Sequence, residues 1–380
     1  YNDYVMIWKA LCREKEMTVK LAKMGIEKIK PHMVVGEKQD VPPAWALLNS
    51  NESAYGPSPH ARAAAIAAVS SFERYLENPD KTLAPAIARY FGLDPNKITI
   101  GYGSDDLLAR LARAYLGPNT ELVRSANGYL KVPNYAYAND ADVVSVADID
   151  FRPSVDGMID ALTEKTRIVY LANPENPAGT YLNGDEVRRL HAALPESVLL
   201  VIDAAYEEYV DAADYEPAHV LVEEASNVVM CRTFSKIFGL AGARVGWIYG
   251  PDDVIDSVRR IGVTFPAAST SVAAAVAALE DREHTKMVFT ETKKNRNWLS
   301  KQLSDLGLSV VPSQGNFLLV HFPETDKSAT AVDQALQQQG IAVRRFNAPA
   351  FKNSIRITIG HLKEMQAAVQ CISKFLQEEL

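Results

Sequence analysis

The segment CRTFSKIFGLAGARVGW, residues 231–247, joins the end of an apolar run to a lysine and a glycine-rich turn. The apolar run, NVVMC, predicts a buried strand that ends at a small polar cluster formed by Thr233, Ser235 and Lys236. Most lysines are solvated surface residues. A lysine that is held beside hydroxyl groups at a strand end, and is partly desolvated there, can instead attack an aldehyde to form a Schiff base. The segment therefore points to covalent lysine chemistry at the edge of a sheet.

Short runs rich in valine, isoleucine and leucine surround this segment and alternate with amphipathic helical patterns. Such an alternation is typical of a mostly parallel sheet between layers of helices. We expect its strands at residues 97–101, 120–125, 142–146, 166–174, 197–206, 227–234 and 243–250. In a sheet of this kind, ligands bind beyond the carboxyl ends of the strands.

The chain has 380 residues, more than one compact core usually holds, so we expect two domains. The predicted fold class is α/β, with a large domain built on a mostly parallel, seven-stranded sheet between helices and a smaller α+β domain. Helical patterns at 5–29 and 270–306, and strand patterns near the C-terminus, lie outside the large domain. The expected parts are an N-terminal arm with part of the small domain at 1–48, the large domain at 49–270 and the small domain at 271–380.

The composition limits the possible partners and ligands. The formal net charge of −7 disfavours contact with a phosphate backbone, so we expect no nucleic-acid partner. Three cysteines, far apart in the sequence, argue against a disulfide framework and fit a reducing, cytoplasmic compartment. The seven histidines show no metal-ligand spacing, so we expect no metal. No apolar run reaches the ~18 residues of a membrane helix, and we expect neither a membrane partner nor a signal peptide.

Polar residues follow four of the predicted strands. They form the segments GYGSDD at 101–106, NPENPAG at 173–179, DAAYEEY at 203–209 and RTFSK at 232–236. Because the carboxyl ends of parallel strands meet at one edge of a sheet, we expect these segments to form a single site. Asp203 in the third segment is either a helix N-cap or a carboxylate that pairs with a protonated ring nitrogen.

The GYGSDD segment predicts an anion site. Glycines followed by a helix start leave the backbone N–H groups of Ser104 and Asp105 facing a bound anion. A dinucleotide-binding turn is the competing interpretation, but the segment lacks the third glycine of that motif. The hydroxyls of Thr233 and Ser235 and the guanidinium of Arg244 would add further donors, and arginine suits the geometry of a phosphate.

Three segments, NPENPAG, DAAYEEY and SKIFGLAGARVGW, occur in the order found in pyridoxal phosphate (PLP)-dependent aminotransferases of the aspartate aminotransferase fold, class I/II. The chain resembles this family, and within it most of all the histidinol-phosphate aminotransferases. NSNESAYGPSP at 49–59, SQGNFLLV at 313–320 and SIRITIG at 354–360 match further along the chain. The resemblance covers about residues 40–370 and implies that the large domain binds pyridoxal 5'-phosphate.

The resemblance implies a role for each residue of the site. Lys236 would form the Schiff base and carry protons, and Asp203 would keep the pyridine nitrogen protonated. Asn176 and Tyr206 would hydrogen-bond the ring hydroxyl, although simple packing is the other interpretation of Tyr206. Tyr129 would stack on the ring. The residues expected to hold the phosphate are Ser104, Asp105, Thr233, Ser235 and Arg244.

The same resemblance implies a homodimer in which Tyr55 reaches the phosphate of the neighbouring subunit. Arg356 would bind an anionic group of the substrate, next to Asn176. Arg344 is a second candidate for this role, and a plain surface position is an equally good interpretation of it.

The expected reaction moves an amino group between an amino acid or amino phosphate and a 2-oxo acid, with histidinol phosphate and 2-oxoglutarate as the first pair considered. Aromatic or other amino acids are alternative donors. A second alternative is a PLP-dependent decarboxylase related to threonine-phosphate decarboxylase. A third is a ligand-binding protein without catalysis, which would have no need of Lys236, Asp203 and Arg244 together.

Overall fold

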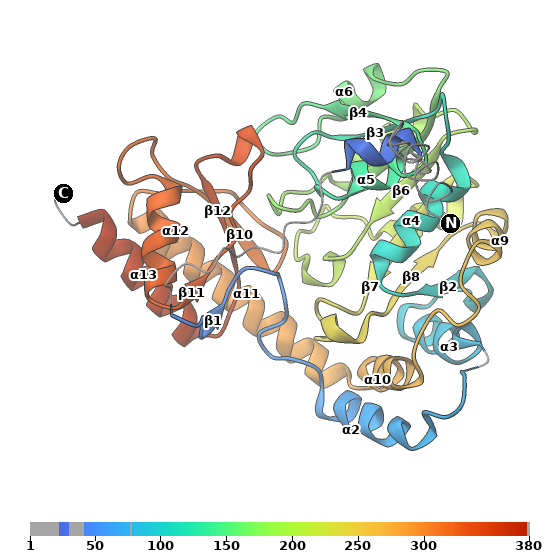
Figure 1. Ribbon diagram of the computed structural model, residues 1–380, viewed down its shortest axis with the longest axis horizontal. Helices are drawn as coiled ribbons and strands as arrows, with labels where there is room; N and C mark the ends of the chain where they lie inside the picture. Colours follow the sequence, from blue (N-terminus) through green and yellow to red (C-terminus); the bar gives the residue numbers. More distant parts are fainter. Residues whose placement is uncertain (1–22, 30–41, 77, 378–380) are drawn as a thin grey trace, which may run out of the picture.

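The computed structural model describes residues 23–29, 42–76 and 78–377 (Figure 1). Most of the helix expected over residues 5–29 lies outside this part of the chain. Its last residues form a short 3₁₀ helix, η1, at Met24–Lys28. The backbone N–H of Gly25 in this turn donates to the Asp140 carboxylate at 2.7 Å. This hydrogen bond attaches η1 to the segment just before β4 of the large sheet.

The large sheet has seven strands in the order β2-β8-β7-β6-β5-β3-β4. Its strands are β2 Ile98–Gly101, β3 Glu121–Ser125, β4 Asp142–Val146, β5 Thr166–Ala172, β6 Leu199–Asp203, β7 Val228–Thr233 and β8 Gly246–Tyr249. All neighbouring pairs are parallel except those of β8, which runs antiparallel to β7 and β2. The prediction of an α/β fold with a mostly parallel, seven-stranded sheet is confirmed.

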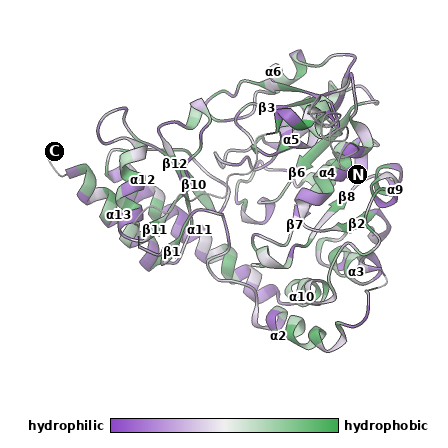
Figure 2. Cartoon of the chain, in the orientation of Figure 1, coloured by the Kyte–Doolittle hydropathy of each residue, from purple (hydrophilic) through white to green (hydrophobic). Residues whose placement is uncertain are grey.

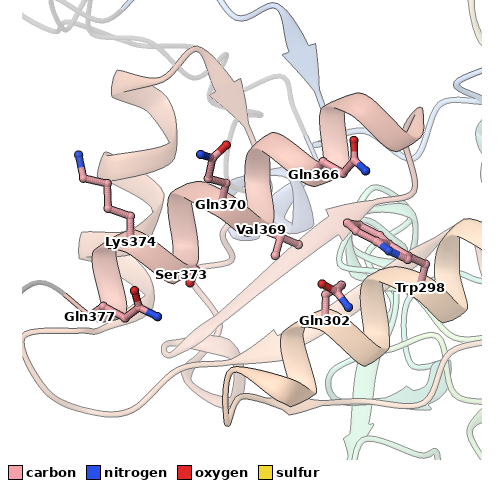
Figure 3. A pocket seen from close by; sticks show the side chains of 8 residues that line it. All are labelled: Trp298, Gln302, Gln366, Val369, Gln370, Ser373, Lys374 and Gln377. Atoms are coloured by element: carbon pink, nitrogen blue, oxygen red, sulfur yellow. The ribbon is translucent and has the colours of Figure 1, made fainter.

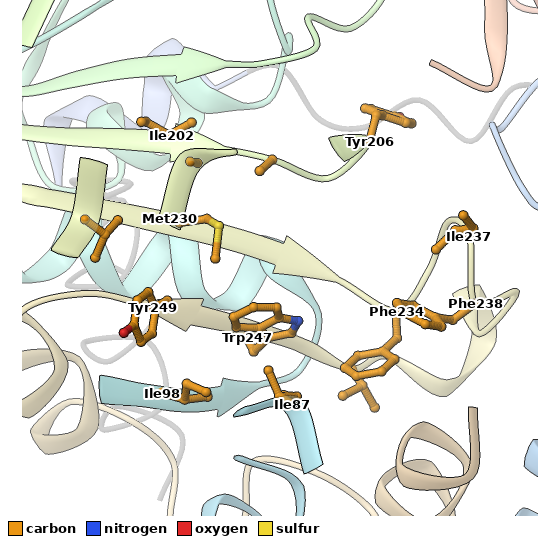
Figure 4. Packing of buried hydrophobic residues seen from close by; sticks show 14 of the residues in the cluster. Ile87, Ile98, Ile202, Tyr206, Met230, Phe234, Ile237, Phe238, Trp247 and Tyr249 are labelled. Atoms are coloured by element: carbon orange, nitrogen blue, oxygen red, sulfur yellow. The ribbon is translucent and has the colours of Figure 1, made fainter. Parts of the chain in front are cut away.

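Both faces of the large sheet are buried. In β6, Leu200 and Ile202 belong to one hydrophobic cluster, whereas Leu199 and Val201 belong to the other. This is the period-two alternation of a strand whose two faces are both covered. Figure 4 shows Ile202 and Met230, from neighbouring strands, side by side in the first cluster. Each such side chain contributes about 1.5–3 kcal/mol when it is fully buried, so the sheet is the stable frame of the molecule.

Helices cover the sheet on both sides (Figure 1). The first cluster contains residues of α2 Pro59–Ala68, α3 Pro79–Phe91, α6 Val155–Asp160, α7 Gly184–Ala192, α8 Ala218–Glu224 and α10 Ser269–Glu280. The second contains residues of α4 Ser104–Tyr115, α5 Val132–Tyr137 and α9 Asp252–Arg260. The strands of the large sheet are mostly hydrophobic, as Figure 2 shows, while the covering helices are amphipathic.

A smaller α+β part lies beside the large sheet. It has a three-stranded antiparallel sheet in the order β12-β10-β9 and a two-stranded parallel sheet, β1-β11. The strands are β1 Ala46–Leu47, β9 Ser309–Val310, β10 Phe317–His321, β11 Ile341–Ala342 and β12 Ser354–Thr358. They pack in one cluster with the helices α11 Arg282–Asp305, α12 Ala329–Gln338 and α13 Leu362–Gln377.

The chain enters this smaller part twice, because β1 precedes the large sheet in sequence and pairs with β11. Helix α10 crosses the boundary expected at residue 270, and it packs against α2 and α3 in the core of the large sheet. The domain boundaries remain a prediction. Within the described part of the chain, no helix has both the length and the hydrophobicity to cross a membrane. The same residues contain no group of three or more histidine, cysteine or acidic side chains that could hold a metal ion.

Candidate active site

Lys236 lies three residues after the end of β7, at the carboxyl edge of the large sheet. Its Nζ donates to the carbonyl oxygen of Ser50 at 3.4 Å and lies 5.6 Å from the centroid of the Tyr206 ring. The loop that carries the lysine is anchored by Phe234 and Phe238, whose buried rings lie 5.0 Å apart (Figure 4). The lysine is therefore half-buried on a firmly packed loop, and it faces a tyrosine that follows β6.

Asp203 is the last residue of β6, and its side chain is buried. Its carboxylate accepts hydrogen bonds from the Tyr170 hydroxyl at 2.7 Å and from the backbone N–H of Ala205 at 3.2 Å. Burial raises the pKa of Asp203 to about 6, while the Tyr170 hydrogen bond and the charge of Lys236 act in the opposite direction. The sheet thus holds a desolvated carboxyl group near the lysine, and a cation placed beside it would favour the ionised form.

The Tyr206 hydroxyl links the carboxyl edge of the large sheet to the three-stranded sheet of the smaller part. Its oxygen accepts hydrogen bonds from the side-chain amides of Asn51 at 3.0 Å and Asn176 at 3.4 Å. The Asn176 amide is oriented by Arg356, whose Nη1 donates to its Oδ1 at 2.6 Å. Residues that follow β5 and β6 therefore meet a residue of β12 and the 49–59 segment at one point. The structure brings Asn176, Tyr206 and Arg356 into direct contact, and their chemical roles remain predictions.

Arg356 is buried beside neutral acceptors. Besides Asn176, its guanidinium donates to the carbonyl oxygen of Asn49 at 2.8 Å. Its Nε has no hydrogen-bond partner within the described part of the chain. Burial lowers the pKa of Arg356 to about 10, and the like charge of Arg344 adds to this effect. A buried guanidinium with neutral partners favours a bound anion.

Arg344 lies next to Arg356 because their backbones exchange two hydrogen bonds, at 3.0 and 2.9 Å. Both guanidinium groups lie near the ring of Phe346, at 5.9 Å for Arg344 and 5.4 Å for Arg356. Arg356 also lies 5.4 Å from the Phe317 ring. The second candidate for anion binding is thus adjacent to the first, and aromatic rings flank the pair.

The guanidinium of Arg244 lies close to the N-terminus of α4. Gly103 precedes α4 with a φ of 78°, and a Cβ atom on it would lie 2.4 Å from Nη2 of Arg244. Nη1 of Arg244 donates to the Ser235 hydroxyl at 3.4 Å, and the Thr233 hydroxyl donates to the same oxygen at 2.9 Å. The first backbone N–H groups of the helix, beginning at Ser104, have no partner within the helix. Helix N–H groups, two hydroxyls and a guanidinium are a donor set that fits a phosphate.

The side chain of Asp105 has partners that the sequence did not indicate, and its role at the phosphate remains a prediction. Its Oδ1 accepts hydrogen bonds from the Tyr129 hydroxyl at 3.0 Å and the Tyr135 hydroxyl at 2.6 Å. Burial raises the pKa of both tyrosines, and the nearby carboxylate adds to this effect, so both remain donors. The side chain of Asp105 therefore orients Tyr129, and the backbone N–H is the group that remains suited to an anion.

Within its own chain, Tyr55 contacts residues of the smaller α+β part. Its hydroxyl accepts a hydrogen bond from the side-chain amide of Asn295 at 3.0 Å, and its ring meets that of His361 edge-on at 5.0 Å. These partners lie on α11 and just before α13. The expectation that Tyr55 serves a neighbouring subunit stays a prediction.

Sequence reasoning missed several residues that hold the site together. Asn51 contacts Tyr206, Tyr170 contacts Asp203, and Tyr135 contacts Asp105. None of them follows a strand end, which was the signal we used. Asn51 lies in the 49–59 segment, where only Tyr55 received a role. Tyr170 lies within the strand predicted at 166–174, and Tyr135 lies in a segment for which no element was predicted.

Two surface hollows lie away from these residues. One has a volume of about 650 Å³ and lies on α11 and α13, where Trp298 and several glutamines line it (Figure 3). The other has a volume of about 670 Å³ and lies near the start of α3, with Arg110 and Arg259 in its wall. Both arginines are paired with carboxylates, Asp106 and Asp80. Neither hollow includes a residue of the predicted site.

The comparisons with known proteins agree with this geometry. Residues 43–372 match the family described as aminotransferase class I and II. The chain belongs to this family. It is 42% identical to a histidinol-phosphate aminotransferase of Rhodopseudomonas palustris (strain BisB18) over 87% of this chain and 91% of that protein. It is 41% identical to one of Paramagnetospirillum magneticum over 95% of this chain and 99% of that protein.

A solved structure gives the same result. The histidinol-phosphate aminotransferase of Sinorhizobium meliloti, in complex with pyridoxal-5'-phosphate, has a TM-score of 0.83 and 31% identity, covering 88% of this chain and 91% of that chain. The predicted family and enzyme class are confirmed. Family membership and this relative also support pyridoxal phosphate as the cofactor, and the donor set described above fits it.

Proposed function

We propose that this aminotransferase uses pyridoxal phosphate to exchange an amino group between histidinol phosphate and 2-oxoglutarate, as a step in amino-acid biosynthesis. The observation that carries the proposal is one group of side chains: Lys236, the buried carboxyl of Asp203 and the buried guanidinium of Arg356. A lysine nucleophile, an acid for a ring nitrogen and a receptor for an anion are the three things such a reaction needs. The names of the relatives supply the substrate.

The residues present fit the cofactor. Ser104, Thr233, Ser235 and Arg244 would hold its phosphate, with the backbone N–H of Asp105 as a further donor. Asp203 would pair with the ring nitrogen, Asn176 and Tyr206 would contact the ring hydroxyl, and Tyr129 would lie against the ring. When bound, pyridoxal phosphate supplies an electron sink for the substrate carbon that loses its proton.

The chain's own residues would then do three things. Asp203 would keep a proton on the ring nitrogen beside it, since two ionised partners stabilise each other in a desolvated site. Lys236 would take up and return a proton at Nζ, from a position that the Ser50 carbonyl oxygen fixes. Arg356, with Arg344 next to it, would bind the anionic group of the substrate.

We also propose that the enzyme is a homodimer with shared sites. Large apolar side chains are exposed along α2, the following turn and the loop before α10, and the Tyr75 and Phe265 rings stack at 4.1 Å. The residues are Ile66, Val69, Phe72, Tyr75, Val263 and Phe265. An exposed apolar surface of this kind is typical of a subunit interface. Tyr55 lies in the segment that leads to α2, which is where a residue shared with the partner's site would be.

We infer a cytoplasmic location from the three dispersed cysteines.

The absorbance spectrum of the purified protein, before and after L-glutamate is added, tests the cofactor and the reaction together. We expect the visible band of lysine-bound pyridoxal phosphate to fade and a near-ultraviolet band of the amine form to grow. Lys236→Ala should lack both the band and turnover, while the matched control Lys97→Ala should keep both, because Lys97 pairs with Glu223 far from the site. Turnover in Lys236→Ala would contradict the mechanism.

Histidinol phosphate, phenylalanine and glutamate should be compared as donors with 2-oxo acids. A value of kcat/KM for histidinol phosphate that exceeds the value for phenylalanine supports the proposal, and the reverse result would assign an aromatic aminotransferase. Release of carbon dioxide without a 2-oxo acid would assign a decarboxylase. Arg356→Lys should raise KM for histidinol phosphate at least tenfold, because one point charge replaces a guanidinium that donates to two acceptors.

A further inference from the structure

Asn51 uses all of its polar groups in hydrogen bonds. Its Nδ2 donates to the Tyr206 hydroxyl at 3.0 Å, and its backbone N–H donates to Oγ1 of Thr358 at 3.0 Å. The Thr358 hydroxyl donates to its Oδ1 at 3.1 Å, and its carbonyl oxygen accepts from Asn316 at 3.1 Å. The residue is 1% exposed. It therefore ties the Tyr206 hydroxyl to β12 of the smaller sheet.

These partners define the orientation of the Asn51 side-chain amide, that is, which end is the oxygen and which the nitrogen. The two ends of a side-chain amide are assigned from their partners, and here a hydroxyl donor occupies Oδ1. In the structure Nδ2 therefore faces Tyr206 and donates to its hydroxyl. The backbone adds a second restriction, since Asn51 has a φ of 55°, a left-handed conformation that asparagine and glycine tolerate better than other residues.

The two side-chain amides that donate to the Tyr206 oxygen leave its hydroxyl to act as a hydrogen-bond donor. Its oxygen can accept two hydrogen bonds, and Asn51 and Asn176 occupy both positions. The O–H proton is then left to be donated to a third group. We propose that Asn51 is a positioning residue that turns the Tyr206 O–H toward the ring oxygen of the cofactor and couples it to β12. This inference rests on the proposed function.

Other charged or titratable groups face Tyr206 from four different segments. Lys236 lies over its ring, and Arg356, Tyr129 and Tyr209 each interact with it electrostatically. All of them stay in place when Asn51 is changed. A change in the proton affinity of the site can then be assigned to the lost amide and the hydroxyl it orients.

The expected effect has a definite sign. A hydrogen bond donated to the cofactor's ring oxygen withdraws negative charge from it and loosens the proton shared with the lysine nitrogen. Without that donor, the proton is held more tightly. The pH midpoint of the visible absorption band should rise by about one unit, which is the size of a hydrogen bond to a charged group.

Asn51→Gly is the test variant, because glycine fits the left-handed backbone and adds no charge. Thr358→Val removes the hydroxyl that orients the amide and that also accepts the Asn51 backbone N–H. The matched control is Asn316→Ala, which deletes another buried amide of the same network that has no hydrogen bond to Tyr206. The measurements are a pH titration of the visible band and the Tm of each cofactor-free protein.

We expect the midpoint to rise by about one unit in Asn51→Gly, by less in Thr358→Val and not at all in Asn316→Ala, although the Tm falls in all three. An unshifted midpoint in Asn51→Gly, or an equal shift in Asn316→Ala, would overturn the proposal. If Asn51→Gly does not fold, Thr358→Val becomes the test variant. A pH midpoint in Thr358→Val equal to that of the wild type would then overturn the proposal. A wild-type protein that lacks the band contradicts the proposed function, whereas a wild-type band with unshifted variants contradicts only the role of Asn51.

Discussion

Replacing Asp203 by asparagine tests whether the fold carries an unfavourable charge at its site. Burial raises the pKa of Asp203 to about 6 in the folded chain, against an ordinary value of 3.8. A raised folded-state pKa contributes stability that is fully present below pH 3.8 and is lost as the pH rises through 6. The difference of about two units, at about 1.4 kcal/mol each, means that the wild type loses about 3 kcal/mol over this range.

Asparagine has no proton to lose at this position, so its contribution does not change with pH. It keeps one acceptor oxygen for Tyr170 and loses the acceptor for the Ala205 N–H, at a cost of about 1 kcal/mol. Cofactor-free Asp203→Asn should therefore be less stable than the wild type by about 1 kcal/mol near pH 3.5, and more stable by about 2 kcal/mol at pH 8.

Urea unfolding of both cofactor-free proteins between pH 3.5 and pH 8 measures this difference directly. Burial raises the pKa of Glu175 to about 8, and the charge of Asp203 adds to this rise, so the titration of Glu175 cancels in the comparison except for the part that Asp203 contributes. Asp211→Asn is the matched control, because hydrogen bonding to Lys293 and the charge of Arg296 lower the pKa of Asp211 despite its partial burial, so the pH trend should have the opposite sign. A free-energy difference between Asp203→Asn and wild type that stays constant with pH would refute the reasoning.

Two further predictions concern the phosphate site and the dimer. Gly103→Ala should weaken pyridoxal phosphate binding at least tenfold in an equilibrium titration, because the new Cβ would lie 2.4 Å from Arg244, whereas Gly92→Ala has a similar positive φ, meets no atom within 4 Å and should leave the affinity unchanged. Equal losses in the two variants would show that backbone strain alone is responsible. Co-expression of Lys236→Ala and Tyr55→Phe subunits should give hybrid dimers more active than either parent, since one site then has both residues intact. Hybrids no more active than the parents would place Tyr55 in its own subunit's site.

The sheet and its strand ends could be predicted because buried parallel strands leave a local signal. The apolar run VLLVI before Asp203 and the run VVMC before Arg232 are both uninterrupted and contain β-branched residues, and a polar residue follows each. The direction of β8 could not be predicted in the same way, because an apolar alternation is the same whichever way a strand runs. Its reversal depends on the turn after Lys236, where Gly239 has a φ of 66° and Arg244 a φ of 53°.

The partners of the site residues could not be predicted, because they depend on contacts between distant segments. Asn51 and Thr358 are 307 residues apart, and nothing in either local pattern indicates the other. Asp105 was assigned to the phosphate from its place at a helix start. Its side-chain partners, Tyr129 and Tyr135, come from a loop and a helix that follow β3 in the sequence and pack on the same face of the sheet as α4.

The charges of the site explain why stability and function are opposed in this fold. Asp203 and Arg356 are both desolvated, and burial moves the pKa of each toward its neutral form. Their protein hydrogen-bond partners are neutral groups, such as Tyr170 for the acid and Asn176 for the base, which orient the charges without cancelling them. A ligand with a protonated nitrogen and an anionic group supplies both missing charges, so its binding should stabilise the folded state. Substitutions of Asp203 or Arg356 that stabilise the folded, ligand-free protein should therefore lower its activity.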